Sequence, residues 1–311
     1  MRTLLPACLM STLLTLVMLN AFDPAVRVLV EKNSPPESRP TRSPAKKRIL
    51  FISGGCSHGP GQHEHEAGCA LLARSLNENL PTVQAEVLAD GWPKDAAAFE
   101  NVAAVVMYGD GGEGHMVNPY LEQTAALMKK GIGLACLHYA VEVPKGAAGN
   151  DFLDWIGGYF ETDWSVNPTW KADFKALPTH PVTRGVKPFG TYDEWYYHMR
   201  FREGMKGVTP LLTAVPPAST LDRKDGPHEN NPHVRAEQGK PQHLAWCRER
   251  PDGGRGFGIT GGHFHRNWSD ENYRKLVLNA IAWVAKAEVP AAGVASQPPT
   301  PAELAANPCK K

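Results

Sequence analysis

The feature that most constrains the fold of this chain is an alternation of short apolar runs with segments of helical periodicity. The run at residues 102–107 is almost continuously apolar, which is typical of a strand buried on both faces of a parallel sheet. Strand-like and helical segments alternate in the order 49–53, 66–79, 85–90, 102–107, 118–130 and 132–137. This alternation predicts an α/β fold built on a doubly wound parallel sheet.

The second half of the chain carries further strand-like runs that are less regular. They occupy residues 169–177, 194–199, 208–215, 243–249 and 256–260. After the last of them, Ser269 or Asp270 is placed to cap a helix that runs to about Lys286. The apolar residues of this segment recur three and four positions apart, which predicts a helix with one face in the core.

The two ends of the chain lack a core-forming pattern. Residues 1–22 combine Arg2 with an interrupted apolar stretch, which predicts a secretory signal peptide or, as the rival, an uncleaved N-terminal anchor. Residues 23–46 form a Pro/Ser-rich linker, and residues 289–311 form an Ala/Pro-rich tail that is expected to be disordered. The folded domain is therefore expected at residues 47–288 of a protein exported to the periplasm or the extracellular space.

Composition excludes some classes of partner. Hydrophobic residues make up 42% of the chain and charged residues 21%, and the formal net charge is +1. No basic surplus is present for nucleic acid, so membrane contact is expected only through an uncleaved N-terminus. Six cysteines are too few for a disulfide scaffold, although Cys56 and Cys69 could form a bridge in an oxidising compartment.

The turn between the first predicted strand and the first helix is rich in histidine. Its sequence, GGCSHGPGQHEHEAGC at residues 54–69, contains His58, His63 and His65. A turn that needs only conformational freedom has no use for three imidazoles. We therefore expect this turn to form one wall of a functional site.

Polar side chains also follow the other predicted strands. The carboxyl ends of parallel strands lie at one edge of a sheet, where open α/β proteins bind their ligands. The side chains that should converge there are His58, His63 and His65 after the first strand, Tyr108 and Asp110 after the third, His138 and Tyr139 after the fourth, and His263 and His265 after the last. This convergence predicts a polar, histidine-rich pocket.

Two kinds of chemistry fit such a pocket. Neutral imidazoles with a carboxylate suit a divalent transition metal such as zinc, and they also suit general acid–base catalysis near neutral pH. The spacing matches no strong metal signature such as HExxH, so both chemistries stay open. His263 and His265 would point the same way on an extended chain. His63 and His65 would diverge by about 200° inside a helix, so that only one would face the site.

Other conspicuous side chains have a structural interpretation. Cys136 is expected to face the core, since its strand is buried on both sides. A surface position is expected for the histidines of polar loops, His115, His180, His228 and His233. The aromatic run of Trp195, Tyr196 and Tyr197 is equally consistent with packing and with a wall that stacks on sugar rings.

Three motifs carry a resemblance to a known family. The segments ILFISGG, GIGLACLHYA and GFGITGGHFHRNW, followed by a helix ending in LVLNAIAWVA, resemble the ThuA-like (trehalose utilisation) domain family of the class I glutamine amidotransferase-like superfamily. The resemblance covers about residues 47–288. It implies a flavodoxin-like three-layer sandwich, a parallel sheet with helices on both faces. It also implies a role in sugar catabolism, on disaccharides or their oxidised 3-keto derivatives.

The chain departs from the catalytic pattern of that superfamily. His138 stands where amidotransferases place their nucleophilic cysteine, and Cys136 lies two residues earlier, within the strand. The glutamate expected near His263 is missing, because Arg266 and Asn267 stand there. A Cys-His-Glu glutaminase is therefore not expected, and imidazole in place of a thiol favours a metal or acid–base site.

Together these residues predict an enzyme that hydrolyses or lyses a small carbohydrate. The catalytic candidates are His63, His138 and His263. The candidates for substrate binding are Tyr108, Asp110, Tyr139, Glu194 and Trp195. The candidate ligands of a zinc-like metal are His58, His65 and His265. The alternatives are a non-catalytic carbohydrate-binding domain and a metal-stabilised structural domain without catalysis.

Overall fold

A computed structural model describes residues 45–55 and 57–305 of the 311-residue chain. The predicted signal peptide or anchor at residues 1–22 lies outside these ranges, as does nearly all of the predicted linker at residues 23–46. Within the two described ranges, no helix combines the length and the apolar character that a membrane crossing requires.

Seven strands form the central sheet, in the order β2-β1-β3-β4-β11-β10-β9. The parallel set is β1 (Lys47–Ser53), β2 (Val83–Leu88), β3 (Val102–Tyr108), β4 (Gly133–Leu137) and β11 (Arg255–Ile259). β10 (Gln242–Glu249) lies between β11 and β9 (Val208–Ala214) and pairs antiparallel with both. Residues 250–254 alone link β10 to β11, and a link this short cannot make the crossover that parallel pairing needs. The predicted parallel sheet is therefore mostly, but not entirely, parallel.

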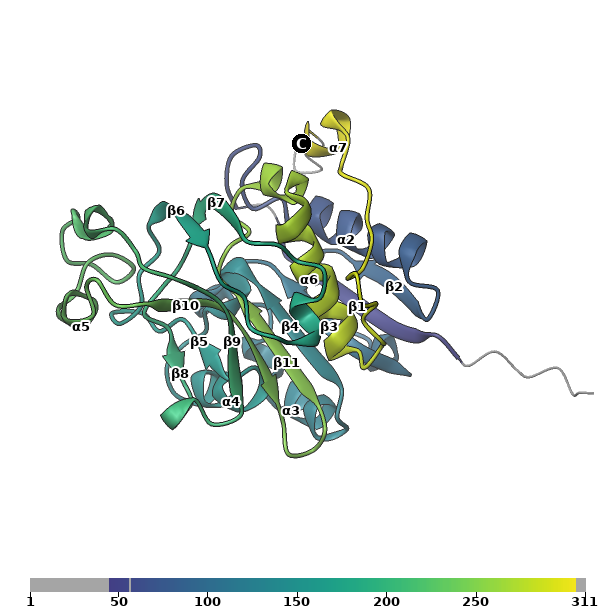
Figure 1. Cartoon of the computed structure of the whole chain (residues 1–311). Coiled ribbons are helices and arrows are strands. Elements are labelled where there is room, and N and C mark those ends of the chain that lie inside the picture. The colour runs from purple at the N-terminus through teal and green to yellow at the C-terminus, as the bar shows by residue number, and fades with distance from the viewer. Residues whose placement is uncertain (1–44, 56, 306–311) are drawn as a thin grey trace, which may run out of the picture. The chain divides into compact units, whose positions relative to one another are not determined.

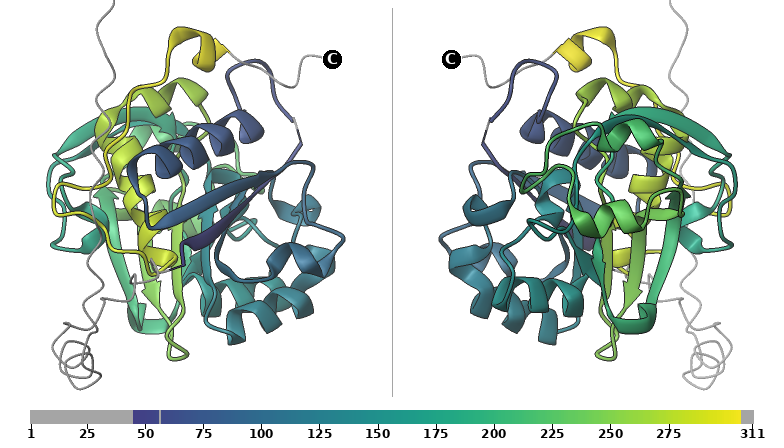
Figure 2. Two further views of the ribbon diagram at one scale, coloured as in Figure 1. Left: turned by 90° about the vertical axis from the view of Figure 1, so that its right-hand side faces the viewer. Right: turned by 90° about the vertical axis from the view of Figure 1, so that its left-hand side faces the viewer.

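Helices cover both faces of the sheet (Figures 1 and 2). α2 (His65–Asn79) and α6 (Glu271–Val284) lie on one face, and α3 (Leu121–Lys129) and α4 (Ala147–Trp155) lie on the other. Alternate side chains of β1 enter the two cores, because successive residues of a strand point to opposite faces. Phe51 packs with the buried residues of α2 and α6, whereas Ile52 packs on the side of α3 and α4. The predicted three-layer α/β sandwich is confirmed.

A hairpin of β6 (Thr169–Phe174) and β7 (Phe189–Glu194) lies outside the main sheet and delivers Glu194 to the site. A shorter pair joins β5 (Gly158–Tyr159) to β8 (Arg200–Phe201). The predicted strand at residues 194–199 is wrong, because β7 already ends at Glu194 and the aromatic residues after it pack in irregular backbone.

The remaining helical segments are short. α5 spans Pro232–Ala236 and α7 spans Pro301–Ala305. The 3₁₀ helices are η1 (Ala96–Phe99), η2 (Gly112–Gly114), η3 (Asn118–Tyr120), η4 (His138–Val141), η5 (Pro181–Thr183), η6 (Glu203–Met205), η7 (Ala218–Leu221) and η8 (His265–Ser269). Asp270 caps α6 as one of the two predicted residues, because its side chain accepts a hydrogen bond from the Tyr273 N–H at 2.9 Å.

The segment after α6 differs from the disordered tail that composition predicts. Val289 and Val294 are buried in the core beside α6. The Val294 N–H donates to Oδ1 of the buried Asn279 at 2.7 Å. Residues 289–305 therefore extend the domain, because two apolar side chains and a backbone hydrogen bond hold a segment whose composition alone carries no core pattern.

Candidate metal centre and pocket

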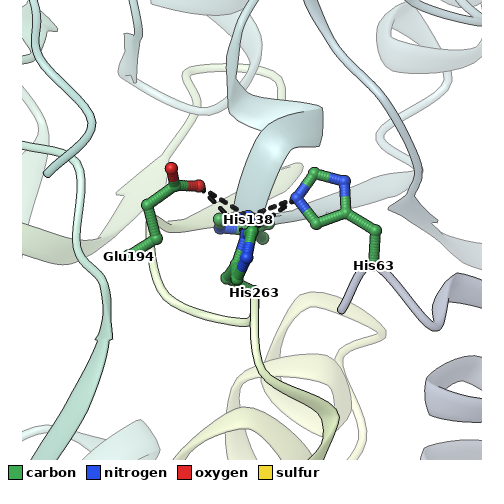
Figure 3. A group of neighbouring side chains, drawn as sticks. All are labelled: His63, His138, Glu194 and His263. Atoms are coloured by element: carbon green, nitrogen blue, oxygen red, sulfur yellow. Dashed lines mark hydrogen bonds and ion pairs between the residues drawn. The ribbon is translucent and has the colours of Figure 1, made fainter. Parts of the chain in front are cut away.

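Four side chains from four separate segments meet at the carboxyl edge of the sheet (Figure 3). His63 lies just before α2, His138 opens η4 directly after β4, Glu194 ends β7, and His263 follows β11. We call these four residues the His–Glu cluster. The structure thus brings together all three histidines predicted to be catalytic and adds Glu194, which had been predicted to bind substrate.

The inner atoms of the His–Glu cluster are close enough to share one ion. His63 Nε2 lies 3.1 Å from His138 Nε2 and 3.0 Å from His263 Nδ1. Glu194 Oε2 lies 3.1 Å from the same His263 Nδ1 and 3.5 Å from His138 Nε2. All four atoms lie within 4.8 Å of one another. The three imidazoles are buried, whereas the Glu194 side chain keeps 17% of its surface exposed.

Each imidazole of the cluster makes a hydrogen bond at its outer nitrogen. The acceptors are the Thr260 carbonyl for His138 Nδ1 (2.7 Å), Gln62 Oε1 for His263 Nε2 (3.0 Å) and Asp110 Oδ1 for His63 Nδ1 (3.1 Å). Carbonyl and carboxylate oxygens only accept, so a neutral ring donates outward and presents a lone pair at its inner nitrogen. Three imidazole lone pairs and a carboxylate oxygen then face one another, and outer partners commonly orient metal ligands in this way.

Burial favours the neutral form that a metal ligand needs. Removal from water lowers the pKa of His138 well below its usual value, and the neighbouring His63 lowers it further. The carbonyl of Thr260 opposes this effect by accepting the Nδ1–H bond. Burial therefore favours a neutral His138 ring, the form that a metal ligand needs.

The backbone at the cluster is strained. His63 and His138 have φ values of 48° and 55°, in the left-handed region that residues other than glycine seldom occupy. Such residues concentrate at functional sites, where the surrounding structure holds them in place. At His138 this conformation turns the chain sharply out of β4 and points the ring back at the cluster.

Two distant loops are tied together to place the histidines. Gln62 and Phe264 form an antiparallel bridge, flanked by a 3.0 Å hydrogen bond from the His63 N–H to the His263 carbonyl. The His265 N–H donates to the Gly61 carbonyl at 2.9 Å on the other side of the bridge. This short ladder fixes the loop before α2 against the loop after β11.

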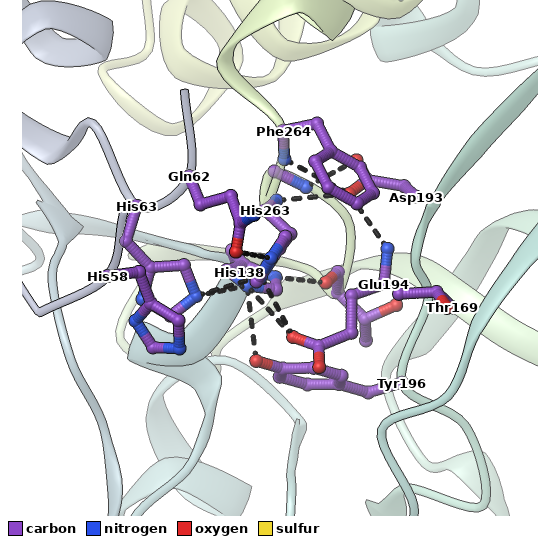
Figure 4. A network of polar contacts seen from close by, with 12 residues as sticks. His58, Gln62, His63, His138, Thr169, Asp193, Glu194, Tyr196, His263 and Phe264 are labelled. Atoms are coloured by element: carbon purple, nitrogen blue, oxygen red, sulfur yellow. Dashed lines mark hydrogen bonds and ion pairs between the residues drawn. The ribbon is translucent and has the colours of Figure 1, made fainter. Parts of the chain in front are cut away.

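Asp193 holds the backbone of Glu194 and His263 in place, and the sequence analysis did not identify it. Its fully buried carboxylate accepts hydrogen bonds from the backbone N–H groups of Gly262 (2.8 Å), His263 (3.1 Å) and Glu194 (2.8 Å) (Figure 4). One side chain thereby joins the loop after β11 to the end of β7. The signal in the sequence was an acidic pair, Asp193-Glu194, at the end of a strand-like run.

His58 and Asp110 lie beside the cluster rather than within it. The His58 ring packs against His63 at a tilt of 38° with ring centroids 3.7 Å apart, and Ser57 Oγ lies 2.8 Å from His58 Nδ1. The Ser57 hydroxyl donates to Asp110 Oδ1 at 2.7 Å. Asp110, predicted to bind substrate, lies outside the lining of the pocket and hydrogen-bonds His63 Nδ1 at 3.1 Å. His58, His63 and Asp110 form a second group whose side-chain atoms are near enough for an ion.

His65 and His265, two predicted metal ligands, contribute no atom to the His–Glu cluster. His65 is the first residue of α2, and its Nδ1–H donates to the Gly55 carbonyl at 2.9 Å. Burial lowers the pKa of His65 to about 4. His265 opens η8, which turns the chain, so the expectation that it points the same way as His263 is wrong.

The aromatic candidates divide between pocket and core. Tyr139 lines the pocket beside the cluster, as predicted, and so does Tyr196, whose hydroxyl lies 3.2 Å from His138 Nε2. Trp195 was predicted to contact substrate but is fully buried, with its indole N–H bonded to the Thr191 carbonyl. Tyr108 is also fully buried, and its hydroxyl donates to the Gly262 carbonyl beneath the site.

A pocket of about 490 Å³ opens beside the cluster. Its walls are lined by His58, His63, Tyr139, Asn167, Glu194, Tyr196, Arg223, Gly226, Pro227, His228 and Glu229. His228 was expected on the surface, but the loop that carries it folds over the pocket. His115 was also expected there and is instead buried, with Nε2 bonded to the Ala140 carbonyl at 3.1 Å.

The three cysteines within the described residues, Cys69, Cys136 and Cys247, lie outside this site. Cys136 is buried in the core on the α3 and α4 side, and burial raises the pKa of its thiol. His138 occupies the sharp turn after the strand, as the sequence alignment indicated. Cys69 is a buried thiol in α2, and Cys56, its candidate disulfide partner, lies outside the described residues.

Comparison with known proteins agrees with this architecture. A family model described as ThuA, trehalose utilisation, matches residues 48–284. A solved ThuA-like protein from Bacteroides uniformis ATCC 8492 is 17% identical, covers 79% of this chain and 95% of its own, and has a TM-score of 0.53, which supports the fold. A ThuA-like protein from Parabacteroides merdae ATCC 43184 is 15% identical, covers 82% and 93%, and has a TM-score of 0.48. No match was found among curated proteins.

Proposed function

The chain belongs to the ThuA (trehalose utilisation) family, and we propose that it is a metal-dependent enzyme that cleaves a C–O bond of a small carbohydrate. The reaction is the hydrolysis or lysis of a disaccharide or of its keto derivative. The observation that carries this proposal is the convergence of three imidazole lone pairs and one carboxylate oxygen beside an open pocket.

The donor set suits a divalent transition metal. Bonds of about 2.1 Å place neighbouring ligand atoms about 3.4 Å apart in a tetrahedron and about 3.0 Å apart in an octahedron. Four of the six separations within the cluster, at 3.0 to 3.5 Å, lie close to these values. Structural zinc sites are closed, whereas catalytic sites keep a position open to substrate. His63 and Glu194 line the pocket, which supports a catalytic role over a purely structural one.

The side chains of the pocket suit a sugar. His63, His138, Glu194 and His263 would hold a divalent ion, which would supply Lewis-acid chemistry to a substrate oxygen or to water. Burial raises the pKa of Tyr196 well above its usual value, so its hydroxyl stays protonated and donates a hydrogen bond to a substrate oxygen. The Tyr139 ring offers an apolar face to sugar C–H groups, and Asn167 and Arg223 offer hydrogen bonds to sugar hydroxyls.

Export is a further part of the proposal and rests on the sequence of residues 1–22. We expect the expressed full-length protein to be recovered in the periplasm or the medium, or attached to the membrane by its N-terminus. Cell fractionation with N-terminal sequencing distinguishes cleavage from anchoring, and recovery of the intact chain in the cytoplasm contradicts export.

Metal content and turnover test the proposed function together. The purified protein should carry one equivalent of a transition metal by elemental analysis and should release product from a panel of glycosides and 3-keto-glycosides. His138→Ala should lose both the metal and the turnover. His243→Gln is the matched control, because this half-buried imidazole bonds Thr213 at 2.9 Å, away from the pocket, and its loss should change neither property.

The same experiment separates the alternatives. Bound metal with no sugar binding or turnover points to a metal-stabilised structural domain. Sugar binding without product points to a non-catalytic carbohydrate-binding domain. Turnover by metal-free protein that survives His138→Ala contradicts the metal-dependent mechanism.

A further inference from the structure

We propose that His228, held by Glu142, is the proton donor to the leaving oxygen of the substrate. This inference rests on the proposed function. It adds a second catalytic group to the pocket, with a role that differs from that of the His–Glu cluster. The cluster offers metal-ligating atoms, whereas His228 carries an exchangeable proton.

His228 and Glu142 form a directed pair. His228 Nε2 lies 2.7 Å from Glu142 Oε1, the Glu142 side chain is 2% exposed, and the His228 side chain is 35% exposed. Glu142 therefore holds Nε2–H from the protein side, and proton exchange with a bound molecule falls to Nδ1. This is the arrangement of a general acid or base: the ring lines the pocket, and a buried carboxylate orients it.

The ring is fixed on its other sides as well. Phe160 stacks on the imidazole with centroids 5.3 Å apart and an interplanar angle of 23°. The His228 carbonyl accepts a 2.9 Å hydrogen bond from the Asn167 N–H, and the Pro227 carbonyl accepts one of 2.8 Å from the Asp163 N–H. The loop is thus anchored directly at His228, so the ring keeps its place over the pocket.

The groups that face the imidazole favour its protonated form. The hydrogen bond to Glu142 raises the pKa of His228 above its usual value, burial opposes this, and the charges of Asp163 and Glu194 raise it further. Arg223 on the same loop pairs with Glu229 at 3.7 Å. A general acid is most effective when its pKa lies near the working pH. Raising the pKa of His228 keeps more of its imidazole protonated at neutral pH.

His228 gives up its Nδ1 proton as the bond to the leaving oxygen breaks. The bond between the sugar carbon and the leaving oxygen breaks with its electron pair on the oxygen, and that oxygen takes the proton from His228 Nδ1. In hydrolysis, the oxygen of water forms the new bond to carbon, and the proton that this water releases restores the imidazolium. In lysis, a water molecule takes the proton of a C–H bond next to a keto group, the electron pair of that bond forms the double bond, and proton exchange with solvent restores the imidazolium of His228.

The test compares substrates whose leaving groups differ. His228→Gln keeps an N–H for Glu142 but has no acidic proton. We expect its kcat to fall about 100-fold or more on a disaccharide, the order of a general-acid contribution, and about tenfold or less on a 4-nitrophenyl glycoside, whose leaving group needs no proton. Metal content should stay at the wild-type level, and added imidazole should restore part of the disaccharide activity of His228→Ala.

The pH profile gives a second readout. The wild-type kcat/KM should fall on the alkaline side as His228 loses its proton, and His228→Gln should lack that limb. Glu142→Gln should move the limb to lower pH, because the carboxylate no longer favours the imidazolium. His233→Gln, in the neighbouring helix α5 and outside the pocket, is the control and should match the wild type.

Four results overturn the inference. Equal losses on both substrate classes with an unchanged pH profile assign His228 to structure alone. Loss of metal in His228→Gln shows that the variant damages the cluster instead. A wild-type protein that turns over no glycoside removes the proposed function and this step with it, whereas wild-type turnover that survives His228→Gln unchanged removes this step alone.

Discussion

The two His-x-His segments of this protein share a spacing but not a role. In each pair, His63 with His65 and His263 with His265, the first imidazole joins the His–Glu cluster and the second is buried outside it. The second histidine is also the residue at which a helix begins, α2 in one case and η8 in the other. The start of a helix, rather than the spacing, therefore decides which histidine of a pair reaches the site.

The largest effect is expected at the first members of the pairs. His63→Ala or His263→Ala removes one of four ligand atoms and leaves the others without a complete set. Bound metal should be lost. The loss in kcat/KM should exceed ~100-fold, the most that is usual when a residue hydrogen-bonded to a metal ligand is replaced. Elemental analysis and steady-state kinetics check this. Full metal occupancy in both variants would contradict the assignment.

An outer partner should have a smaller effect. Asp110 Oδ1 lies 3.1 Å from His63 Nδ1, and Asp110→Asn removes its charge while keeping an acceptor oxygen. Metal affinity should fall by about 10-fold, near the lower end for such partners, and competition with a chelator measures it. An affinity equal to that of the wild type would show that Asp110 does not orient the ligand.

Replacing the second histidine of a pair, His65 or His265, should lower the stability of the fold without changing the metal content. His65→Leu leaves the Gly55 carbonyl without its 2.9 Å donor, which should lower the free energy of unfolding by about 1–3 kcal/mol. Urea denaturation of metal-free protein measures the loss, and elemental analysis should still find full occupancy. If His65→Leu lost its metal and His63→Ala kept it, His65 rather than His63 would be the ligand of the pair.

A further effect is confined to acidic pH. Burial lowers the pKa of His115 to about 4, whereas the unfolded chain titrates near the usual histidine value. The unfolded state therefore binds more protons between about pH 6.5 and 4, so stability is complete above this window and falls through it by about 1.4 kcal/mol per pH unit for this group. Urea denaturation with chelator present should show a shallower fall for His115→Gln, and an equal slope would contradict the assignment.

Strand ends could be predicted from sequence because they depend on local patterns. Apolar runs located β1, β3, β4 and β11, and the parallel arrangement then gathered His63, His138 and His263 at one edge. The reversal of β10 also had a local signal, since Pro251-Asp252-Gly253-Gly254 is a hairpin turn sequence.

The rest of the site depends on contacts between distant segments. Glu194 reaches the cluster because the β6–β7 hairpin folds back, and Asp193 then binds the loop after β11 through backbone N–H groups. His228 enters the pocket because Glu142 and Asn167 hold its loop there. A polar loop sequence looks the same whether it lies in solvent or over a pocket, so local patterns assigned His228 to the surface.

Crystals of the metal-loaded protein, measured at the absorption edge of the metal that elemental analysis identifies, test the central claim most directly. We predict one anomalous peak within about 2.0–2.3 Å of His63 Nε2, His138 Nε2, His263 Nδ1 and a Glu194 carboxylate oxygen, and none at His65 or His265. A peak held by other residues, or no peak at the cluster in protein that carries one equivalent of metal, would contradict the account.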